Sequence, residues 1–117
     1  MATLFDRVKR RPTRDERDDD ELQRDADRAG CAPLASQAER SVCSIHGELQ
    51  SVTLRPVDGV TALEATLHDG SDTVTLVWLG RRRIEGIGVG RRLTVHGRVG
   101  RRGSERVLYN PRYELQA

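Results

Sequence analysis

The stretch from Thr73 to Gly80, Thr-Val-Thr-Leu-Val-Trp-Leu-Gly, constrains the fold more than any other part of the chain. It is the most apolar and β-branched run in the sequence, and it contains the only tryptophan, Trp78. Valine, threonine and tryptophan suit a pleated, half-buried surface, so the run predicts a central strand. It is too short for a membrane-spanning helix, which needs about 20 apolar residues. Because apolar side chains fall on both of its faces, we expect both to be covered, as in a small closed barrel.

Charge divides the chain into two parts. Residues 1–41 carry nine basic and ten acidic side chains, whereas residues 42–117 carry eleven basic and eight acidic ones. We therefore expect a charged N-terminal arm and linker over residues 1–41 and one folded domain over residues 42–117. Within the arm, Leu22, Ala26 and Ala29 fall at helical spacing in a highly charged run, which predicts either a solvated helix or disorder. The folded part is mildly basic, which permits a polyanionic partner without requiring one.

From Val42 onward the apolar residues recur with a period of two, which indicates β-strands. The first strand changes phase near Gln50 and Ser51, a pattern typical of a β-bulge that bends a strand. The alternation predicts further strands over residues 60–68, 73–80, 92–99 and 105–115, with tight connections at 69–72 and 100–103. Between the third and fourth strands, Ile84 and Ile87 are three residues apart, which favours one helical turn or an ordered loop. The predicted fold class is all-β: a five-stranded Greek-key barrel with a short helical turn between strands 3 and 4, preceded by the charged arm.

Five short segments carry a resemblance to a known class of domain. The chain resembles the oligonucleotide/oligosaccharide-binding (OB) modules of bacterial proteins, in particular the wedge domain of the branch-migration helicase. As a whole it looks like a small actinobacterial family of stand-alone OB-fold proteins with a charged N-terminal arm. The segments are Ile45-His46-Gly47-Glu48-Leu49, Leu67-His68-Asp69-Gly70, Thr73-Val74-Thr75-Leu76-Val77-Trp78, the run from Gly90 to Val99, and Asn110-Pro111-Arg112-Tyr113-Glu114-Leu115.

The resemblance implies a nucleic-acid-binding module, in particular for single-stranded DNA or RNA. OB barrels bind along the face of strands 2 and 3 and the loops that flank it. Here that face and its loops supply hydroxyls, cations and aromatic rings. Trp78 shares its alternation with Val74 and Leu76, which favours a core position unless the strand end twists it outward, and Tyr109 fits either the rim or the core. The candidate binding residues are Arg55, Thr66, His68, Thr75, Trp78, Arg98, Arg101, Arg102 and Tyr109.

A protein-interaction or accessory module without nucleic acid is the alternative, since the aromatic rings that usually stack on bases are few. Asp18, Asp19 and Asp20 form the densest group of carboxylates, but they lie in the charged arm and not on a rigid element, so we expect no enzyme. The resemblance to a helicase domain does not extend to a glycine-rich phosphate loop. Cys31 and Cys43 form no disulfide framework or zinc spacing, so we expect no metal, no cofactor, reduced thiols and a cytoplasmic location without membrane contact.

Overall fold

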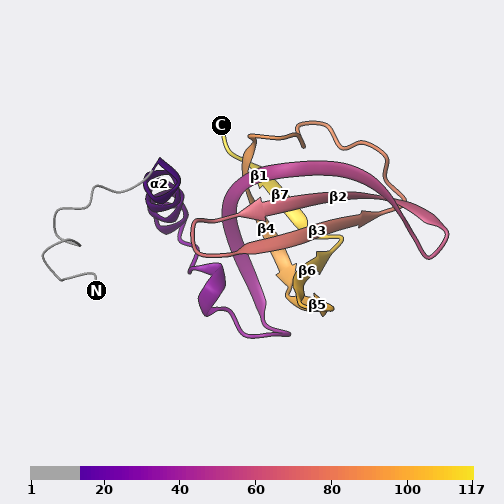
Figure 1. Cartoon of the computed structure of the whole chain (residues 1–117), viewed down its shortest axis with the longest axis horizontal. Helices are drawn as coiled ribbons and strands as arrows, with labels where there is room; N and C mark the ends of the chain where they lie inside the picture. Colours follow the sequence, from indigo (N-terminus) through magenta and orange to yellow (C-terminus); the bar gives the residue numbers. More distant parts are fainter. Residues whose placement is uncertain (1–13) are drawn as a thin grey trace, which may run out of the picture.

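The computed structural model describes residues 14–117, in which β-strands predominate (Figure 1). In chain order, a helix and a single 3₁₀ turn precede seven strands. Within the described part of the chain no helix is long and apolar enough to cross a membrane. The elements are α2 (Arg14–Arg28), η1 (Leu34–Ser36), β1 (Val42–Val57), β2 (Val60–His68), β3 (Thr73–Leu79), β4 (Arg92–Arg98), β5 (Gly100–Arg102), β6 (Glu105–Tyr109) and β7 (Arg112–Leu115).

The strands form one sheet in the order β5-β6-β3-β2-β1-β4-β7. β3 and β6 are parallel, and the other neighbouring pairs are antiparallel. β4 and β5 lie near opposite ends of this order, yet a single residue, Val99, separates them in the chain. The sheet must therefore curl strongly to bring its two ends together, although its hydrogen-bonded ladder does not close. The prediction of a closed five-stranded barrel was wrong in both closure and strand number.

The number of strands rises from five to seven because the predicted connection at 100–103 contains a short strand and the predicted fifth strand is interrupted. The fourth strand ends at Arg98, one residue early, because the amide of Val99 donates to the carbonyl of Ser41 in the linker. The predicted tight connection at 100–103 was wrong, because Gly100–Arg102 forms β5 and the turn lies at residues 103–104. The predicted fifth strand breaks at Asn110, which has a positive φ of 49°, and at Pro111, which has no amide hydrogen for a ladder. After this break β7 pairs with β4, on the far side of β4 from β1.

Two local predictions are confirmed and one is wrong. The register of β1 against β2 shifts between Leu49 and Ser51, which is the expected bulge. The tight connection between β2 and β3 spans residues 69–72, as expected. Between β3 and β4 the helical turn was wrong and the loop alternative holds, because residues 80–91 form turns and bends in which Gly80, Gly86 and Gly90 adopt positive φ angles.

The core explains why β3 is apolar on both faces. Its inward residues, among them Leu76 and Trp78, join the main cluster enclosed by the curled sheet. On its outer face Val77 is fully buried by a second, smaller cluster with Ala62 and Val107. A neighbouring strand and its side chains therefore cover the second face, so β3 needs no closed barrel to be buried.

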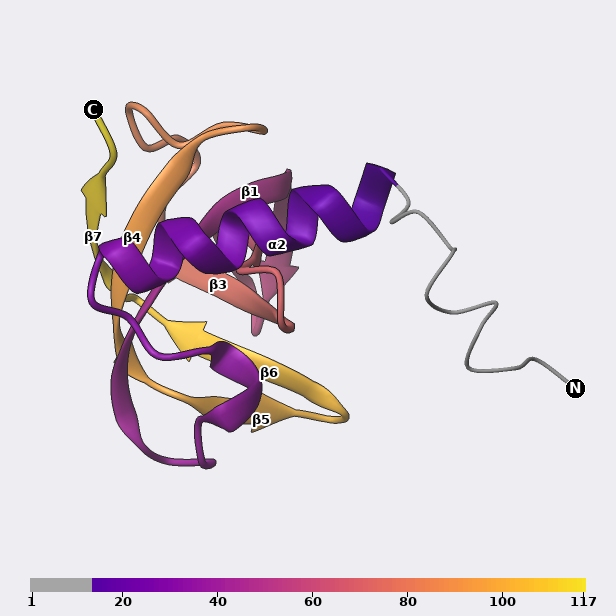
Figure 2. The same ribbon diagram turned by 90° about the vertical axis from the view of Figure 1, so that its left-hand side faces the viewer.

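Helix α2 and the linker pack against the domain (Figure 2). The helical form of the predicted arm is observed over Arg14–Arg28, while the first 13 residues of the arm lie outside the described part of the chain. Leu22 and Ala26 of the helix are buried, and Leu34 of the linker is fully buried in the main core cluster. The helix approaches the β2–β3 turn so closely that a Cβ on Gly70 would clash with the carbonyl oxygen of Asp19.

Candidate nucleic-acid interface

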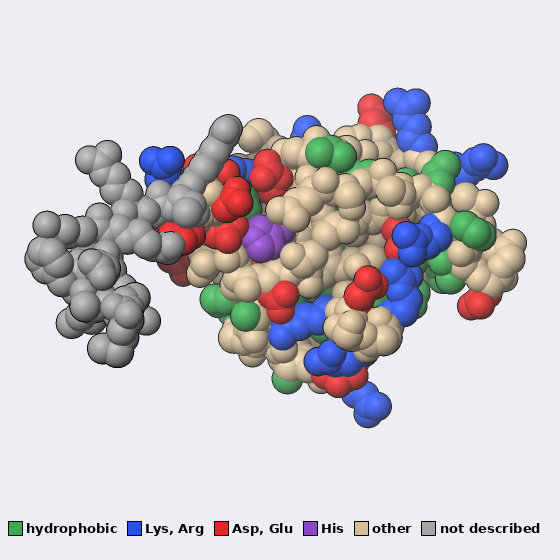
Figure 3. Space-filling model, viewed as in Figure 1, with side chains coloured by type: hydrophobic (Ala, Val, Ile, Leu, Met, Phe, Trp, Pro, Cys, Tyr) green, Lys and Arg blue, Asp and Glu red, His purple; other side chains and the backbone are tan. Residues whose placement is uncertain are grey.

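The outer face of β1, β2 and β3 carries a patch of hydroxyl groups. Ser51, Thr66 and Thr75 alternate with core residues along their strands. In the register of the sheet they lie side by side across the three strands. The hydroxyl of Ser51 donates to Oγ1 of Thr66 over 2.8 Å. Thr53 and Thr73 extend this patch along the strands, and uncharged groups cover much of the same side in Figure 3. We call these five side chains the hydroxyl face.

An open hollow of about 350 Å³ lies where the hydroxyl face meets the β5–β6 hairpin. All of its lining residues have polar or charged side chains, so it suits a charged or sugar-like group better than an apolar molecule. Three of the predicted site residues, Thr66, Thr75 and Arg101, line it together. The remaining lining residues are Asp72, Thr73, Ser104, Glu105 and Arg106.

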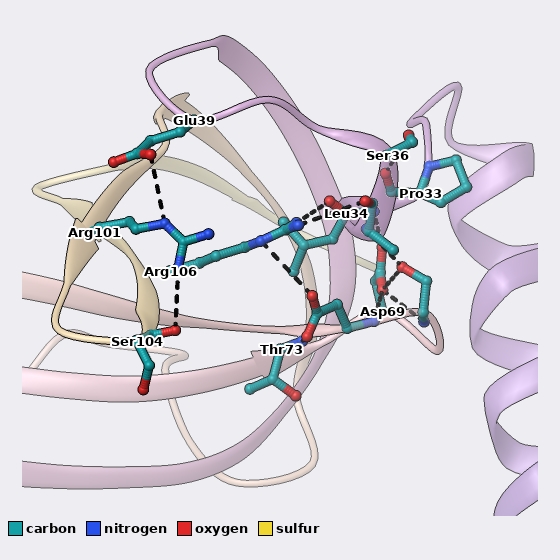
Figure 4. A network of polar contacts seen from close by, with 12 residues as sticks. Pro33, Leu34, Ser36, Glu39, Asp69, Thr73, Arg101, Ser104 and Arg106 are labelled. Carbon is teal, nitrogen blue, oxygen red and sulfur yellow. Dashed lines mark hydrogen bonds and ion pairs between the residues drawn. The ribbon is translucent and has the colours of Figure 1, made fainter.

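The arginines of the hollow are engaged in surface ion pairs (Figure 4). Nε of Arg101 lies 3.5 Å from a carboxylate oxygen of Glu39, and both side chains are about half exposed. Nε of Arg106 lies 3.7 Å from a carboxylate oxygen of Asp72, and its guanidinium also donates to the carbonyl of Leu34. Exposed pairs of this kind contribute little to stability, so Arg101 can exchange Glu39 for another anion at small cost.

Arg102 makes the strongest ion pair of the interface. Its guanidinium donates to both carboxylate oxygens of Glu64, over 2.9 and 3.0 Å, and to Glu105 over 3.2 Å. Glu64 is only 6% exposed, and the hydrogen bonds from Arg102 hold the pKa of its carboxyl below the usual value, helped by the charges of Arg102 and Arg55. The same bonds raise the pKa of Arg102. The charge predicted to close over a phosphate is thus already matched by a buried carboxylate, and the phosphate contact of Arg102 stays a prediction.

Three other predicted residues lie on or beside the hydroxyl face. His68, at the end of β2, has its ring nitrogens 2.9 Å from Asp19 of α2 and 3.1 Å from Thr73. Arg55 is exposed on the outer face of β1, in register with Ala62. Tyr109 of β6 is 49% exposed and in register with Val77, which puts a ring at the edge of the same face.

Two predicted residues do not belong to the interface. Trp78 is only 5% exposed, its indole nitrogen donates to the carbonyl of Pro111 over 3.1 Å, and its ring packs edge-on against Tyr113. Trp78 therefore occupies the core position that its alternation favoured, and little of its ring is exposed to a ligand. Arg98 donates to the carbonyl of Arg40 over 2.7 Å, which ties β4 to the linker.

Helix α2 covers the end of the outer face with carboxylates. A carboxylate oxygen of Asp25 lies 3.1 Å from Nε2 of the buried His46 and 3.5 Å from Arg92. Glu21 lies 3.3 Å from the same arginine. In Figure 3 acidic side chains gather at this end of the molecule. An anion approaching this end meets negative charge.

Sequence reasoning missed the roles of Thr73, Asp72 and Arg106. The alternation of β3 places Thr73 on the same face as Thr75, so the sequence did contain a signal that Thr73 belongs to the candidate site. Arg106 carried no local signal, because its partners Asp72 and Leu34 are 34 or more positions away. Asp69, which is buried, is a similar case. Its carboxylate accepts hydrogen bonds from the amides of Leu34, Ser71 and Asp72 and joins the linker to the β2–β3 turn.

No family model and no curated protein sequence matches the chain. Among solved structures, the fold is similar to part of RecG in a structure of RecG bound to a three-way DNA junction, with a TM-score of 0.62 and 19% sequence identity. The match covers 73% of this chain and 12% of the RecG chain. At this identity the likeness concerns the fold alone.

Proposed function

We propose that this protein is a non-catalytic nucleic-acid-binding module that takes single-stranded DNA or RNA along the hydroxyl face. The observation that carries the proposal is the hollow in which Thr66, Thr75 and Arg101 converge. Hydroxyls and arginines are the groups that most often contact phosphates and sugars. The likeness to part of a protein solved with DNA supports the same reading.

The proposal includes an OB-type architecture. Three features favour it: a long bulged β1 that pairs with both β2 and β4, a parallel pairing of β3 with β6, and a sheet that curls without closing. OB folds are described as partly open barrels that bind on the face of strands 2 and 3, and the hydroxyl face occupies that position.

Binding would depend chiefly on charge and hydrogen bonding. Thr75 makes no side-chain hydrogen bond with the described residues, so its hydroxyl is available to a phosphate oxygen. Arg101 can leave Glu39 for the same group. Tyr109 is positioned to stack on one base, and a stacked base contributes about 1–3 kcal/mol. With a single exposed ring on this face of the described chain, affinity should fall steeply as salt rises.

The test is fluorescence anisotropy of a labelled single-stranded oligonucleotide at low and at physiological salt, with a duplex for comparison. We expect micromolar binding at low salt, weaker binding at higher salt, and preference for the single strand. The double variant Arg101→Gln/Thr75→Val should bind about fivefold more weakly, because it removes one cation and one hydroxyl from the hollow. The control Arg112→Gln removes an exposed arginine from β7, away from the hydroxyl face, and should stay within about twofold.

A protein-interaction module is the second candidate. It is favoured by the pairing of Arg101, Arg102 and Arg106 with carboxylates, which leaves the hairpin less attractive to a polyanion than its composition suggests. Absence of binding to every oligonucleotide, even at the lowest salt, would overturn the nucleic-acid proposal in favour of this one.

A further inference from the structure

Arg55 lies at the end of the sheet opposite helix α2, and three further arginines follow where the chain leaves β3 at that end. In the antiparallel register Arg55 of β1 lies level with Ala62 of β2 and Leu79 of β3. The chain then leaves β3 through Gly80, whose amide donates to the carbonyl of Thr61 over 2.9 Å, and continues directly into residues 81–83. We call Arg55, Arg81, Arg82 and Arg83 the arginine tip.

The arginine tip differs from the hairpin in its lack of partners. All four side chains are exposed, and within residues 14–117 Arg81, Arg82 and Arg83 make no hydrogen bond or ion pair. Arg55 makes none either, although its charge acts on the carboxyl of Glu64 from a distance. The carboxylates nearest in the chain, Asp58 and Glu85, are exposed and make no ion pair with them. Every arginine of the β5–β6 hairpin, by contrast, lies within 4.0 Å of a carboxylate.

Binding of a polyanion gains free energy when cations of the protein replace the counterions of the phosphates. An arginine already paired with a carboxylate must first lose that partner, whereas an unpaired and exposed arginine need not. The unpaired group at the tip therefore offers the greater electrostatic gain. The acidic helix at the other end of the face repels phosphates, so the electrostatic field along the face directs a polyanion towards the arginine tip.

We propose that the arginine tip, and not the β5–β6 hairpin, is the electrostatic anchor for a polynucleotide strand that continues onto the hydroxyl face. This inference rests on the proposed function and adds the path of the ligand. The tip and the hollow are four residues apart along β2, from Ala62 to Thr66, or about 13 Å at about 3.3 Å per residue. A ligand that reaches both must be an extended polymer, so a mononucleotide cannot satisfy the site.

The experiment replaces the three consecutive arginines in the full chain, as Arg81→Gln/Arg82→Gln/Arg83→Gln. The matched control is Arg17→Gln/Arg24→Gln/Arg28→Gln on α2, which removes the same charge from exposed positions at the acidic end. Binding of a labelled 12-nucleotide single strand is followed by anisotropy between 25 and 200 mM salt. Circular dichroism and Trp78 fluorescence check that both variants keep the fold.

We expect the tip variant to lose at least about tenfold in affinity at low salt, and the slope of log affinity against log salt to fall by about 2, since three phosphate contacts at about 0.7 each are removed. The control should lose less than about threefold. Equal losses in the two variants would show that net charge alone matters and would overturn the anchor. An unchanged tip variant would overturn the anchor and leave the proposed function standing, whereas failure of the unmodified chain to bind would overturn both.

Discussion

The two ends of the outer sheet face use charge in different ways. Under helix α2, Asp25 contacts His46 and Arg92, and Asp19 contacts His68. At the arginine tip no such partner exists among residues 14–117. Basic side chains occur at both ends, on β1, β2 and β4 at the helix end and on β1 and the loop after β3 at the tip, and the packed helix supplies carboxylates at only one of them.

This difference teaches that the number of arginines in a segment does not measure its attraction for anions. A paired arginine is part of the structure, because breaking its pair leaves a carboxylate without a partner. An unpaired and exposed arginine adds little to stability and remains free for a ligand. Substitutions that break the buried pair between Arg102 and Glu64 should therefore reduce stability, whereas substitutions at the tip should reduce binding.

The largest effect should come from the linker residue that completes the core. Leu34→Ala removes a fully buried side chain and should lower the free energy of unfolding by about 3 kcal/mol. Urea unfolding followed by Trp78 fluorescence measures it. The control Leu54→Ala, at a position 51% exposed near the tip, should change stability by less than about 0.5 kcal/mol. Equal effects at the two positions would contradict the division between a structural and a free end.

The pair between Arg102 and Glu64 should rank next. Glu64→Gln leaves Arg102 without its buried anion and should cost about 2 kcal/mol at pH 7, since hydrogen bonds to charged groups contribute about 1.5–3 kcal/mol. Glu105→Gln, which removes the exposed partner of the same arginine, should cost less than about 0.5 kcal/mol.

The same pair makes a prediction about pH. Because folding lowers the pKa of Glu64, the pair stabilises the folded chain fully above the ordinary carboxyl value of 4.5, and its contribution is lost as pH falls through the lowered pKa. The difference in unfolding free energy between the unmodified chain and Glu64→Gln should therefore be constant from pH 7 to about pH 5 and shrink below about pH 4.5. A difference that grew on acidification would exclude this ion pair as its source.

The smallest effect concerns the acidic helix. Asp19→Asn/Glu21→Gln removes the carboxylate beside His68 and one of the two beside Arg92, and it should strengthen oligonucleotide binding at low salt by about two- to fivefold, the size expected for exposed pairs. The control Asp18→Asn/Asp20→Asn makes the same change in net charge at exposed positions on α2. Equal gains in the two variants, measured by anisotropy, would mean that general repulsion and not the specific contacts sets the effect.

Local chemistry determined most of the strands and turns. The bulge near Ser51, the turn at residues 69–72 and the strand over Val60–His68 follow from alternation and turn residues alone. Part of the interface was predictable for the same reason, since alternation places Thr66 and Thr75 on one outer face. These signals extend over a few residues, so they survive without knowledge of the whole fold.

The tertiary structure decided which charges are free. Arg102 and Arg81 are both exposed arginines by sequence pattern, yet only Arg102 meets a buried carboxylate, 38 positions away in the chain. Likewise Leu34, in a segment that reads as a linker, fills the core because Asp69 and Arg106 bind its backbone. Ion pairs and packing join residues distant in the chain, and their energies depend on separations and burial that only the folded chain defines. The sequence by itself therefore determined the strands and their faces, and folding determined which arginines remain for a partner.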